Sequence, residues 1–356
     1  MRPLKIYIGY FNYHEQFRSN LVDVLKPIFP EKNPQKYGMD KISIQVVSDE
    51  VSADCFVLPY CWSYYLETKT INKADLLIRS ARNIGKKILI WVTGDFFISL
   101  PSYDNIIGLY TSPYRSKTIN RNIVALPIII RDPLCKLQRE NILINQYTSQ
   151  PVVGFCGQVD LGFFKPAARA IQRVIQAGTY RLGLSHKYIG PVQPPTKLRK
   201  DILDSLVESD QIRTDFIRRD RYKGGIGKIK HNLYRDVKED FVKNIQNTDY
   251  TICVRGTGNF SARFYETLAL GRIPVFINTD CILPFDDTIN WDKQIVQIDK
   301  QDIPQIGRII FEFHNSLSAE KFIELQKNNR KIWEDYFRFS GFMRHLTEKI
   351  RKELSC

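Results

Sequence analysis

The sequence predicts an α/β protein with two parallel-sheet domains, and three observations support this prediction. The chain has 356 residues, about twice the length of a usual domain, so two separate cores are expected. Short runs rich in Ile, Val and Tyr alternate with helical patterns, which is typical of parallel sheets covered on both faces. One segment, residues 250–277, reads as a complete β-α-β unit.

In the first part of the chain, predicted strands alternate with two predicted helices. The helices cover residues 15–28 and 72–84, and Gly85 is a suitable C-cap for the second. The predicted strands are residues 5–10, 42–47, 55–59, 87–92, 106–110 and 123–130. A polar run follows Arg131-Asp132-Pro133 and reads as a linker, so the first domain is predicted to span residues 1–148.

A second series of elements begins after the predicted linker. Residues 151–157 read as a strand, and residues 166–177 read as an amphipathic helix. A strand over residues 294–299 and a helix over 301–314 complete the second sheet. Residues 319–354 carry aromatic and aliphatic side chains at near-helical spacing, which predicts a helical C-terminal tail.

Composition describes an ordinary globular protein, with 43% hydrophobic and 25% charged residues. No apolar run is long enough for a transmembrane helix. Polar residues interrupt the N-terminal apolar run, which argues against a signal peptide and favours a cytoplasmic location. The seven cysteines are scattered and several lie in apolar runs, so we expect reduced thiols. No Cys/His cluster suggests a metal site.

The net charge of +14 indicates anionic partners. Residues 213–238 hold nine basic and three acidic residues, and this patch accounts for most of the excess in the second half of the chain. Such a patch can attract a nucleoside diphosphate, a lipid phosphate, an anionic membrane surface or nucleic acid, and it also fits a plain solvated face. The charge is therefore compatible with peripheral membrane contact.

The most informative segment is the basic, glycine-spaced loop between a strand at residues 250–254 and the helix that follows it. Ligands of open α/β sheets bind at the carboxyl ends of strands, and a helix N-terminus there favours anions. Arg255 precedes the turn, Arg263 lies in the first helical turn, and Glu266 shares its helix face. Two guanidiniums for phosphates and a carboxylate for sugar hydroxyls describe a nucleotide-sugar site. An ion pair of Arg263 with Glu266 or Glu239 is the alternative.

Five further residues are candidates for contact with this donor. Gly256 and Gly258 would let the backbone approach a diphosphate. Asn259 and Ser261 are placed beside them, although capping of the following helix explains both equally well. Gly157, after the first strand of the second domain, is predicted to face the same ligand.

This region resembles the exostosin family of glycosyltransferases. The matching residues are Val254-Arg255-Gly256, Ser261-x-Arg263-x-x-Glu266, Gly271-x-Ile273-Pro274-Val275, Leu283-Pro284-Phe285 and Asn290-Trp291. The resemblance covers residues 240–345 and implies a GT-B fold, in which two Rossmann-like domains face a cleft. It also implies that residues 149–335 bind the nucleotide sugar and that a C-terminal helix, residues 336–356, crosses back to the N-terminal domain.

The resemblance further implies an inverting hexosyl- or glycuronosyl-transferase without a cofactor. A UDP-sugar is the expected donor, and a growing surface polysaccharide or lipid-linked oligosaccharide is the expected acceptor. No metal is expected, because the chain has no clear DxD motif after a strand. Arginines and helix N-terminal amides would stabilise the leaving diphosphate instead.

An inverting mechanism needs a base near the acceptor hydroxyl. Asp95 follows a buried strand and a glycine, and His14 lies in the loop after the first strand, so both are candidates. A turn-forming aspartate and an exposed histidine are the plainer interpretations of these two residues.

Two other functions remain open at this stage. One is a nucleic-acid-binding protein that uses the 213–238 patch, although no known nucleic-acid motif supports it and no nucleic-acid partner is expected. The other is a catalytically inactive glycan-binding relative. The presence of Arg255, Arg263 and Glu266 counts against this second alternative.

Overall fold

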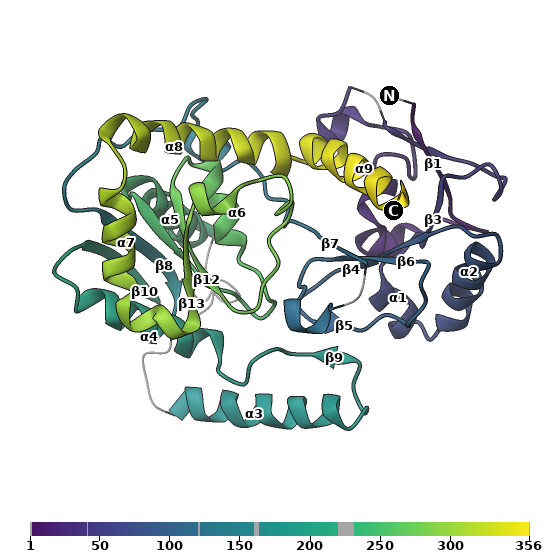
Figure 1. The fold of residues 1–356 in the computed structure, drawn as a ribbon, viewed down its shortest axis with the longest axis horizontal. Helices are drawn as coiled ribbons and strands as arrows, with labels where there is room; N and C mark the ends of the chain where they lie inside the picture. Colours follow the sequence, from purple (N-terminus) through teal and green to yellow (C-terminus); the bar gives the residue numbers. More distant parts are fainter. Residues whose placement is uncertain (1, 41, 120–121, 160–163, 220–230, 356) are drawn as a thin grey trace. The chain divides into compact units, whose positions relative to one another are not determined.

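The chain forms two compact units, each built on a parallel sheet (Figure 1). The computed structural model describes residues 2–40, 42–119, 122–159, 164–219 and 231–355. Unit 1 comprises Met1–Pro127, Ile282–Pro284 and Tyr336–Cys356. Unit 2 comprises Ile128–Cys281 and Phe285–Asp335. The predicted α/β class with two parallel sheets is confirmed.

The sheet of unit 1 has its topological switch point between β1 and β3. In spatial order its strands are β2 (Ile44–Val46), β1 (Leu4–Tyr7), β3 (Cys55–Val57), β4 (Ile88–Val92), β6 (Ile106–Tyr110) and β7 (Ile123–Ala125). The helices of this unit are α1 (Trp62–Glu67), α2 (Ile71–Asn83) and, from the far end of the chain, α9 (Phe339–Ser355). The apolar face of α9 is buried, and its Thr347 hydroxyl lies 3.3 Å from that of Ser43.

The predicted helix over residues 15–28 is wrong. Glu15–Asn20 and Asp23–Leu25 form short 3-10 turns instead. Between them Leu21 has an extended backbone and forms an antiparallel bridge with Tyr60. Because this bridge fixes the segment to the chain that follows β3, a continuous helix cannot pass through it.

The sheet of unit 2 has its topological switch point between β8 and β11. In spatial order its strands are β10 (Arg213–Arg219), β8 (Val152–Gln158), β11 (Tyr250–Cys253), β12 (Ile273–Asn278) and β13 (Val296–Asp299). The helices that pack on its strands are α4 (Pro195–Val207), α5 (His231–Asn247), α6 (Ala262–Ala269), α7 (Ile306–Asn315) and α8 (Ala319–Ile332). Chain connections leave β8 toward β10 on one side and reach β11 on the other, so the switch point lies between β8 and β11.

The predicted β-α-β unit is present, and each end of β11, α6 and β12 lies within one residue of its predicted position. The predicted helix over residues 301–314 begins with a 3-10 turn at Lys300–Gln305 and continues as α7. The predicted helical tail is interrupted by a π-turn at Trp333–Phe337. The change from unit 2 to unit 1 falls within this turn.

The division between the units falls after Pro127, whereas the sequence places it at residue 148. The polar run after Pro127 belongs to unit 2 because its groups bond to that unit. The carboxylate of Asp132 accepts both Nη atoms of Arg330, at 3.0 and 2.7 Å. Farther along, Nη2 of Arg272 donates to Oδ1 of Asn145 at 2.8 Å. Polar composition suggested a solvated linker, but these side chains are hydrogen-bond partners of buried arginines.

His314 on α7 fixes the end of the same segment. It is completely buried, its Nδ1 lies 3.0 Å from the hydroxyl of Tyr250, and its Nε2 lies 2.6 Å from the carbonyl oxygen of Thr148. Its ring stacks on Tyr147 with the centroids 4.4 Å apart. Burial lowers the pKa of His314 below its ordinary value, so the folded protein holds a neutral imidazole.

This burial predicts a loss of stability in mild acid. Below about pH 6.5 the unfolded chain binds a proton at His314 that the folded chain resists, so the free energy of unfolding decreases as the pH falls. His314→Gln cannot titrate and should show a weaker pH dependence. Urea unfolding of both proteins at pH 7.5 and 5.5 measures the difference. An equal pH dependence in the two proteins would contradict the prediction.

Candidate functional site

Arg263, in the first turn of α6, reaches the carboxyl ends of two neighbouring strands. Its Nη2 donates to the carbonyl oxygen of Cys156 on β8 at 2.6 Å, and its Nη1 donates to that of Ile252 on β11 at 3.3 Å. The guanidinium lies 4.2 Å from the ring centroid of Phe155, within cation–π range. Burial lowers the pKa of Arg263, but an arginine remains a cation at neutral pH.

Gly157 makes room for this guanidinium. A Cβ atom at Gly157 would lie 2.7 Å from Nη2 of Arg263, closer than such atoms approach. A larger residue would therefore push the guanidinium away from the carbonyl of Cys156. The structure brings together two residues that the sequence placed in the donor site, one from β8 and one from α6.

Neither predicted carboxylate forms an ion pair with Arg263 among the residues that the structure describes. Glu239 pairs with Lys243 at 2.7 Å. Glu266 lies one turn along α6 and is partly exposed. Its charge acts on Arg263 only as a minor influence that opposes the effect of burial on the pKa. The switch point therefore holds a partly buried cation whose hydrogen bonds go to neutral backbone carbonyls.

Arg255 lies in the loop that follows β11. Its side chain is almost completely buried, and Nη2 donates to the carbonyl oxygen of Gln193 at 3.1 Å. The loop is closed by a bond from the amide of Gly256 to the carbonyl of Phe260, at 3.0 Å. A Cβ atom at Gly256 would meet no atom of the described chain within 4 Å, so the backbone is approachable there. Gly258, in the same loop, is buried.

Helix capping does not explain the two polar residues of the loop. The amide group of Asn259 donates to the carbonyl of Asp280 at 3.2 Å and accepts from the hydroxyl of Thr279 at 2.9 Å. Asn259 therefore ties the loop to the turn after β12. Ser261 occupies the N-cap position of α6, but its hydroxyl bonds to none of the helix amides. Contact of these residues with a donor remains a prediction.

A third guanidinium belongs to the site, and the sequence did not indicate it. Nη2 of Arg199, on α4, donates to the carbonyl of Arg255 at 3.0 Å, and Nη1 donates to that of Gln158 at 3.3 Å. Arg199 thus joins the end of β8 to the loop after β11. Its neighbours on α4 form i,i+4 ion pairs with Asp201 and Asp204. In sequence this charge pattern looks like a solvated helix face, so no local signal identifies Arg199.

Asp95 lies in unit 1, in the turn that follows β4. The turn is held by a bond from the amide of Gly94 to Oγ1 of Thr111 at 3.1 Å and by one from Oγ of Ser112 to the Gly94 carbonyl at 3.0 Å. The carboxylate of Asp95 accepts no hydrogen bond from the described residues, so the turn-capping interpretation has no support. Partial burial raises the pKa of Asp95, which favours proton uptake.

His14 is exposed and lies after β1, near the switch point of the first sheet. Its backbone amide lies 3.4 Å from the hydroxyl of Tyr60, and its ring packs edge-on to Phe17 with the centroids 6.3 Å apart. Tyr60 itself is buried among aromatic rings. The side chain of His14 is therefore accessible, and a role as base stays a prediction.

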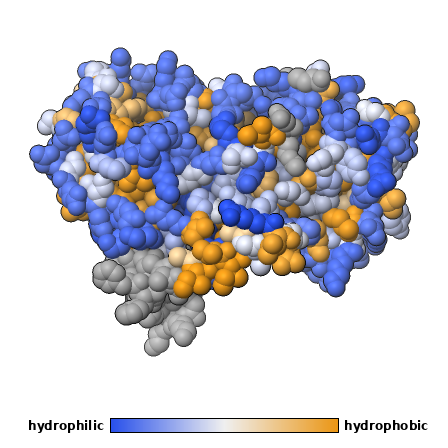
Figure 2. Space-filling model, turned by 60° about the horizontal axis from the view of Figure 1, so that its bottom comes forward, coloured by the Kyte–Doolittle hydropathy of each residue, from blue (hydrophilic) through white to orange (hydrophobic). Residues whose placement is uncertain are grey.

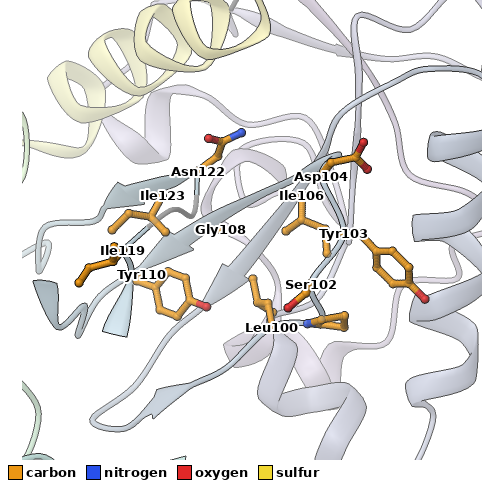
Figure 3. A pocket seen from close by; sticks show the side chains of 11 residues that line it. Leu100, Ser102, Tyr103, Asp104, Ile106, Gly108, Tyr110, Ile119, Asn122 and Ile123 are labelled. Carbon is orange, nitrogen blue, oxygen red and sulfur yellow. The ribbon is translucent and has the colours of Figure 1, made fainter. Parts of the chain in front are cut away.

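A separate cavity of about 440 Å³ lies in unit 1 beside β6 and β7 (Figure 3). Its lining side chains are Leu100, Ser102, Tyr103, Asp104, Ile106, Tyr110, Ile119, Asn122 and Ile123, with Pro101 and Gly108. The lining residues include neither Asp95 nor His14. A Cβ atom at Gly108 would lie 2.6 Å from the ring of Tyr110, so this glycine makes room for that ring.

No three His, Cys, Asp or Glu side chains in the described ranges are grouped to hold a metal ion. Within the same ranges, no helix has the length and apolar character needed to cross a bilayer. The expectation of metal-independent chemistry remains a prediction.

The fold and the site define a class of protein. Unit 2 gathers guanidiniums and a glycine-bearing loop at the switch point of a parallel sheet, where α/β proteins bind nucleotides. With a second parallel-sheet unit that includes the C-terminal helix, this is the GT-B class predicted from the sequence.

Comparison with known proteins agrees with this class. Residues 192–313, about a third of the chain, match the Exostosin GT47 domain, and this segment contains Arg199, Arg255, Arg263 and Glu266. Over 98 residues the chain is 31% identical to Exostosin-1 of Drosophila melanogaster, covering 28% of this chain and 12% of that protein. Over 107 residues it is 32% identical to a probable glucuronosyltransferase of Oryza sativa subsp. japonica, covering 29% of this chain and 26% of that protein. The predicted resemblance to exostosins is confirmed, although the match spans only 12% and 26% of the lengths of these two relatives.

Among solved structures, a glycosyltransferase from Rickettsia africae ESF-5 is similar over 99% of this chain and 98% of that chain. The sequence identity is 13% and the TM-score is 0.38.

Proposed function

We propose that the protein is a glycosyltransferase that moves a sugar from a nucleotide sugar to a glycan acceptor. The donor diphosphate would bind at the carboxyl ends of β8 and β11, and Glu266 would bind a sugar hydroxyl of the donor. A UDP-sugar is the proposed donor, with a hexose or a glycuronic acid as its sugar. The probable glucuronosyltransferases among the similar proteins favour the second of these.

One observation carries the proposal: the partly buried charge of Arg263, which no ion pair offsets among the described residues. Desolvating a cation costs free energy unless an opposite charge compensates for it. A bound diphosphate would supply that opposite charge, with Arg199 and the loop that contains Arg255 adjoining the same two strand ends. Arg272 also lacks a carboxylate partner, but each of its nitrogens donates a hydrogen bond within the fold, whereas the buried Nε of Arg263 has no partner among the described residues.

The proposed reaction is an inverting displacement. The acceptor hydroxyl oxygen attacks the anomeric carbon, and the bond from that carbon to the diphosphate oxygen breaks. The diphosphate leaves with the bonding electrons, and the guanidiniums and the amides of α6 stabilise its charge without a metal ion. The hydroxyl proton passes to a base, for which Asp95 is the proposed residue and His14 the alternative.

The two rival functions are less well supported. Of the basic patch at 213–238, residues 220–230 lie outside the described residues. Within the described part, Arg218 pairs with Asp204 at 2.6 Å and Arg219 pairs with Asp240 at 3.1 Å, which reduces the charge available to a nucleic acid. A catalytically inactive glycan-binding relative would keep the nucleotide site and lack transfer, so a transfer assay distinguishes it.

The test is thermal unfolding with a panel of UDP-, GDP- and CMP-linked sugars, in the presence and absence of EDTA. A nucleotide at about 100 times its dissociation constant should stabilise the folded protein by about 2.7 kcal/mol. Arg255→Ala should weaken the binding of that nucleotide by about tenfold or more, because a positive charge of the loop after β11 is lost. Each protein is compared with its own ligand-free midpoint.

Arg308→Ala is the matched control, because Arg308 is an exposed arginine on α7 of the same unit. It should respond to nucleotides like the wild type. A complete lack of response of the wild-type protein to every nucleotide would refute the donor site. If nucleotides stabilise the wild-type protein only when EDTA is absent, metal independence is refuted and the donor site is not. Binding without sugar transfer would identify the inactive relative.

A further inference from the structure

Helix α3 (Phe164–Arg181) contacts its own unit through polar and aromatic side chains. The guanidinium of Arg173 donates to the carbonyls of Pro191, at 3.0 Å, and of Ile189. The ring of Tyr180 packs on that of Tyr188, with the centroids 5.2 Å apart. These contacts place one face of α3 against the segment that follows it.

The opposite face of α3 is an apolar stripe that is open to solvent. Ile171, Val174 and Ile175 on the helix, and Leu182 directly after its end, follow helical spacing, and their exposed fractions are 63%, 55%, 61% and 75%. Leu184, just after the helix, is 76% exposed. Figure 2 shows hydrophobic side chains gathered on the face where α3 lies in Figure 1. A helix on a soluble protein normally turns its apolar stripe inward, so this stripe is suited to an apolar partner.

The charge around the stripe is entirely basic. Between residues 164 and 187 the sequence has five Lys or Arg residues and no Asp or Glu. Arg181 and Lys187, at the C-terminal end of the stripe, are exposed. An amphipathic helix with apolar side chains on one face and basic residues beside it binds in the interface of an anionic bilayer.

We propose that α3 docks this protein on an anionic membrane surface. The stripe of Ile171, Val174, Ile175 and Leu182 enters the boundary between headgroups and acyl chains, and Arg181 and Lys187 contact lipid phosphates. A second copy of the chain is a poorer partner, because the same basic segment would face its own charge. Nucleic acid would leave the apolar stripe without a contact. Docking here would bring the nucleotide-binding unit to a surface that carries lipid-linked acceptors.

The test is flotation of the full chain with lipid vesicles. The wild-type protein should bind vesicles of phosphatidylcholine mixed with phosphatidylglycerol, and should bind pure phosphatidylcholine vesicles much more weakly. The double variant Ile171→Glu with Ile175→Glu should lower partitioning into the anionic vesicles by about tenfold or more. Because both side chains are exposed, its thermal midpoint and its response to nucleotides should stay unchanged.

The control variant makes the same charge change elsewhere. Val51→Glu with Leu76→Glu replaces two side chains of unit 1 that are each 69% exposed, and it should bind vesicles like the wild type. The proposal is overturned if the wild type ignores anionic vesicles or binds neutral ones equally well. It is also overturned if the wild type forms a dimer that the stripe variant cannot form, and the wild type does not bind vesicles. Nucleotide binding is measured separately, so a failure of the membrane proposal does not refute the proposed donor site.

Discussion

Replacing Arg272 with leucine is expected to lower the free energy of unfolding of unit 2 by about 3–5 kcal/mol. Arg272 is completely buried and directly precedes β12. Its five N–H groups have five hydrogen bonds, which go to the carbonyls of Gln246 (two bonds) and Leu143 and to the side chains of Gln326 and Asn145. Leucine fills part of the volume but leaves these buried acceptors without a donor, at about 1–3 kcal/mol for each unsatisfied group.

The charge itself is not what stabilises this residue. Burial lowers the pKa of Arg272 to about 10, so it remains protonated at neutral pH at a cost in desolvation. The benefit comes from the geometry of the planar fork, which meets acceptors from three segments of the chain. Arg272→Lys keeps the charge with three donors on a single nitrogen, and it should recover little of the lost stability.

Hydrogen exchange of the β12 amides under native conditions would measure the effect within unit 2 alone, which avoids mixing the unfolding of the two units. Arg308→Leu is the control, since Arg308 is exposed and its i,i+4 pair with Glu312 should contribute less than about 1 kcal/mol. A loss below about 1 kcal/mol in Arg272→Leu would show that the network is dispensable.

Arg272 also shows where sequence reasoning reaches its limit. The β-α-β unit around it was predicted to within one residue, because apolar runs, a glycine and a helical pattern are local signals. The burial of Arg272 depends on Leu143 and Gln326, which lie 129 and 54 positions away in the chain. In sequence the residue is one more basic side chain after a glycine.

The difference between local signals and partners distant in sequence also explains why some residues of the candidate site were predicted and Arg199 was not. Arg255, Arg263 and Gly157 were predicted to lie in the site because strand ends, glycines and a helix start mark the edge of a parallel sheet. Arg199 lies on a helix whose other charges form ordinary surface pairs, and only its bonds to β8 and to the loop after β11 reveal it. The polar run around Asn145 was taken for a linker for the same reason, since its partners are distant in sequence.

Replacing Arg263 with alanine is expected to weaken nucleotide binding by about a hundredfold. The guanidinium carries the charge that we assign to the diphosphate, and each charge-assisted bond to phosphate contributes about 1.5–3 kcal/mol. Its bonds to the carbonyls of Cys156 and Ile252 already hold it at the switch point, so little ordering is required when a ligand binds. Titration calorimetry with the nucleotide identified by thermal unfolding measures the affinity.

Gly157→Ala provides a sharper test because it leaves Arg263 in the chain. The added methyl would lie 2.7 Å from Nη2 of Arg263 and force the guanidinium away from Cys156, so this variant alone should also weaken binding. If Gly157 acts through Arg263, the double variant Gly157→Ala with Arg263→Ala should bind no more weakly than Arg263→Ala alone. The methyl then has no guanidinium left to displace.

Gly178→Ala on α3 is the matched control for the added methyl, because a Cβ atom there would meet no described atom within 4 Å. It should leave nucleotide affinity unchanged. Additive losses in the double variant would mean that Gly157 approaches the ligand directly, as the sequence first suggested. Unchanged affinity in Arg263→Ala would remove Arg263 from the donor site and leave it as a clamp between β8 and β11. The cycle therefore separates a cation that binds the ligand from one that only joins β8 to β11.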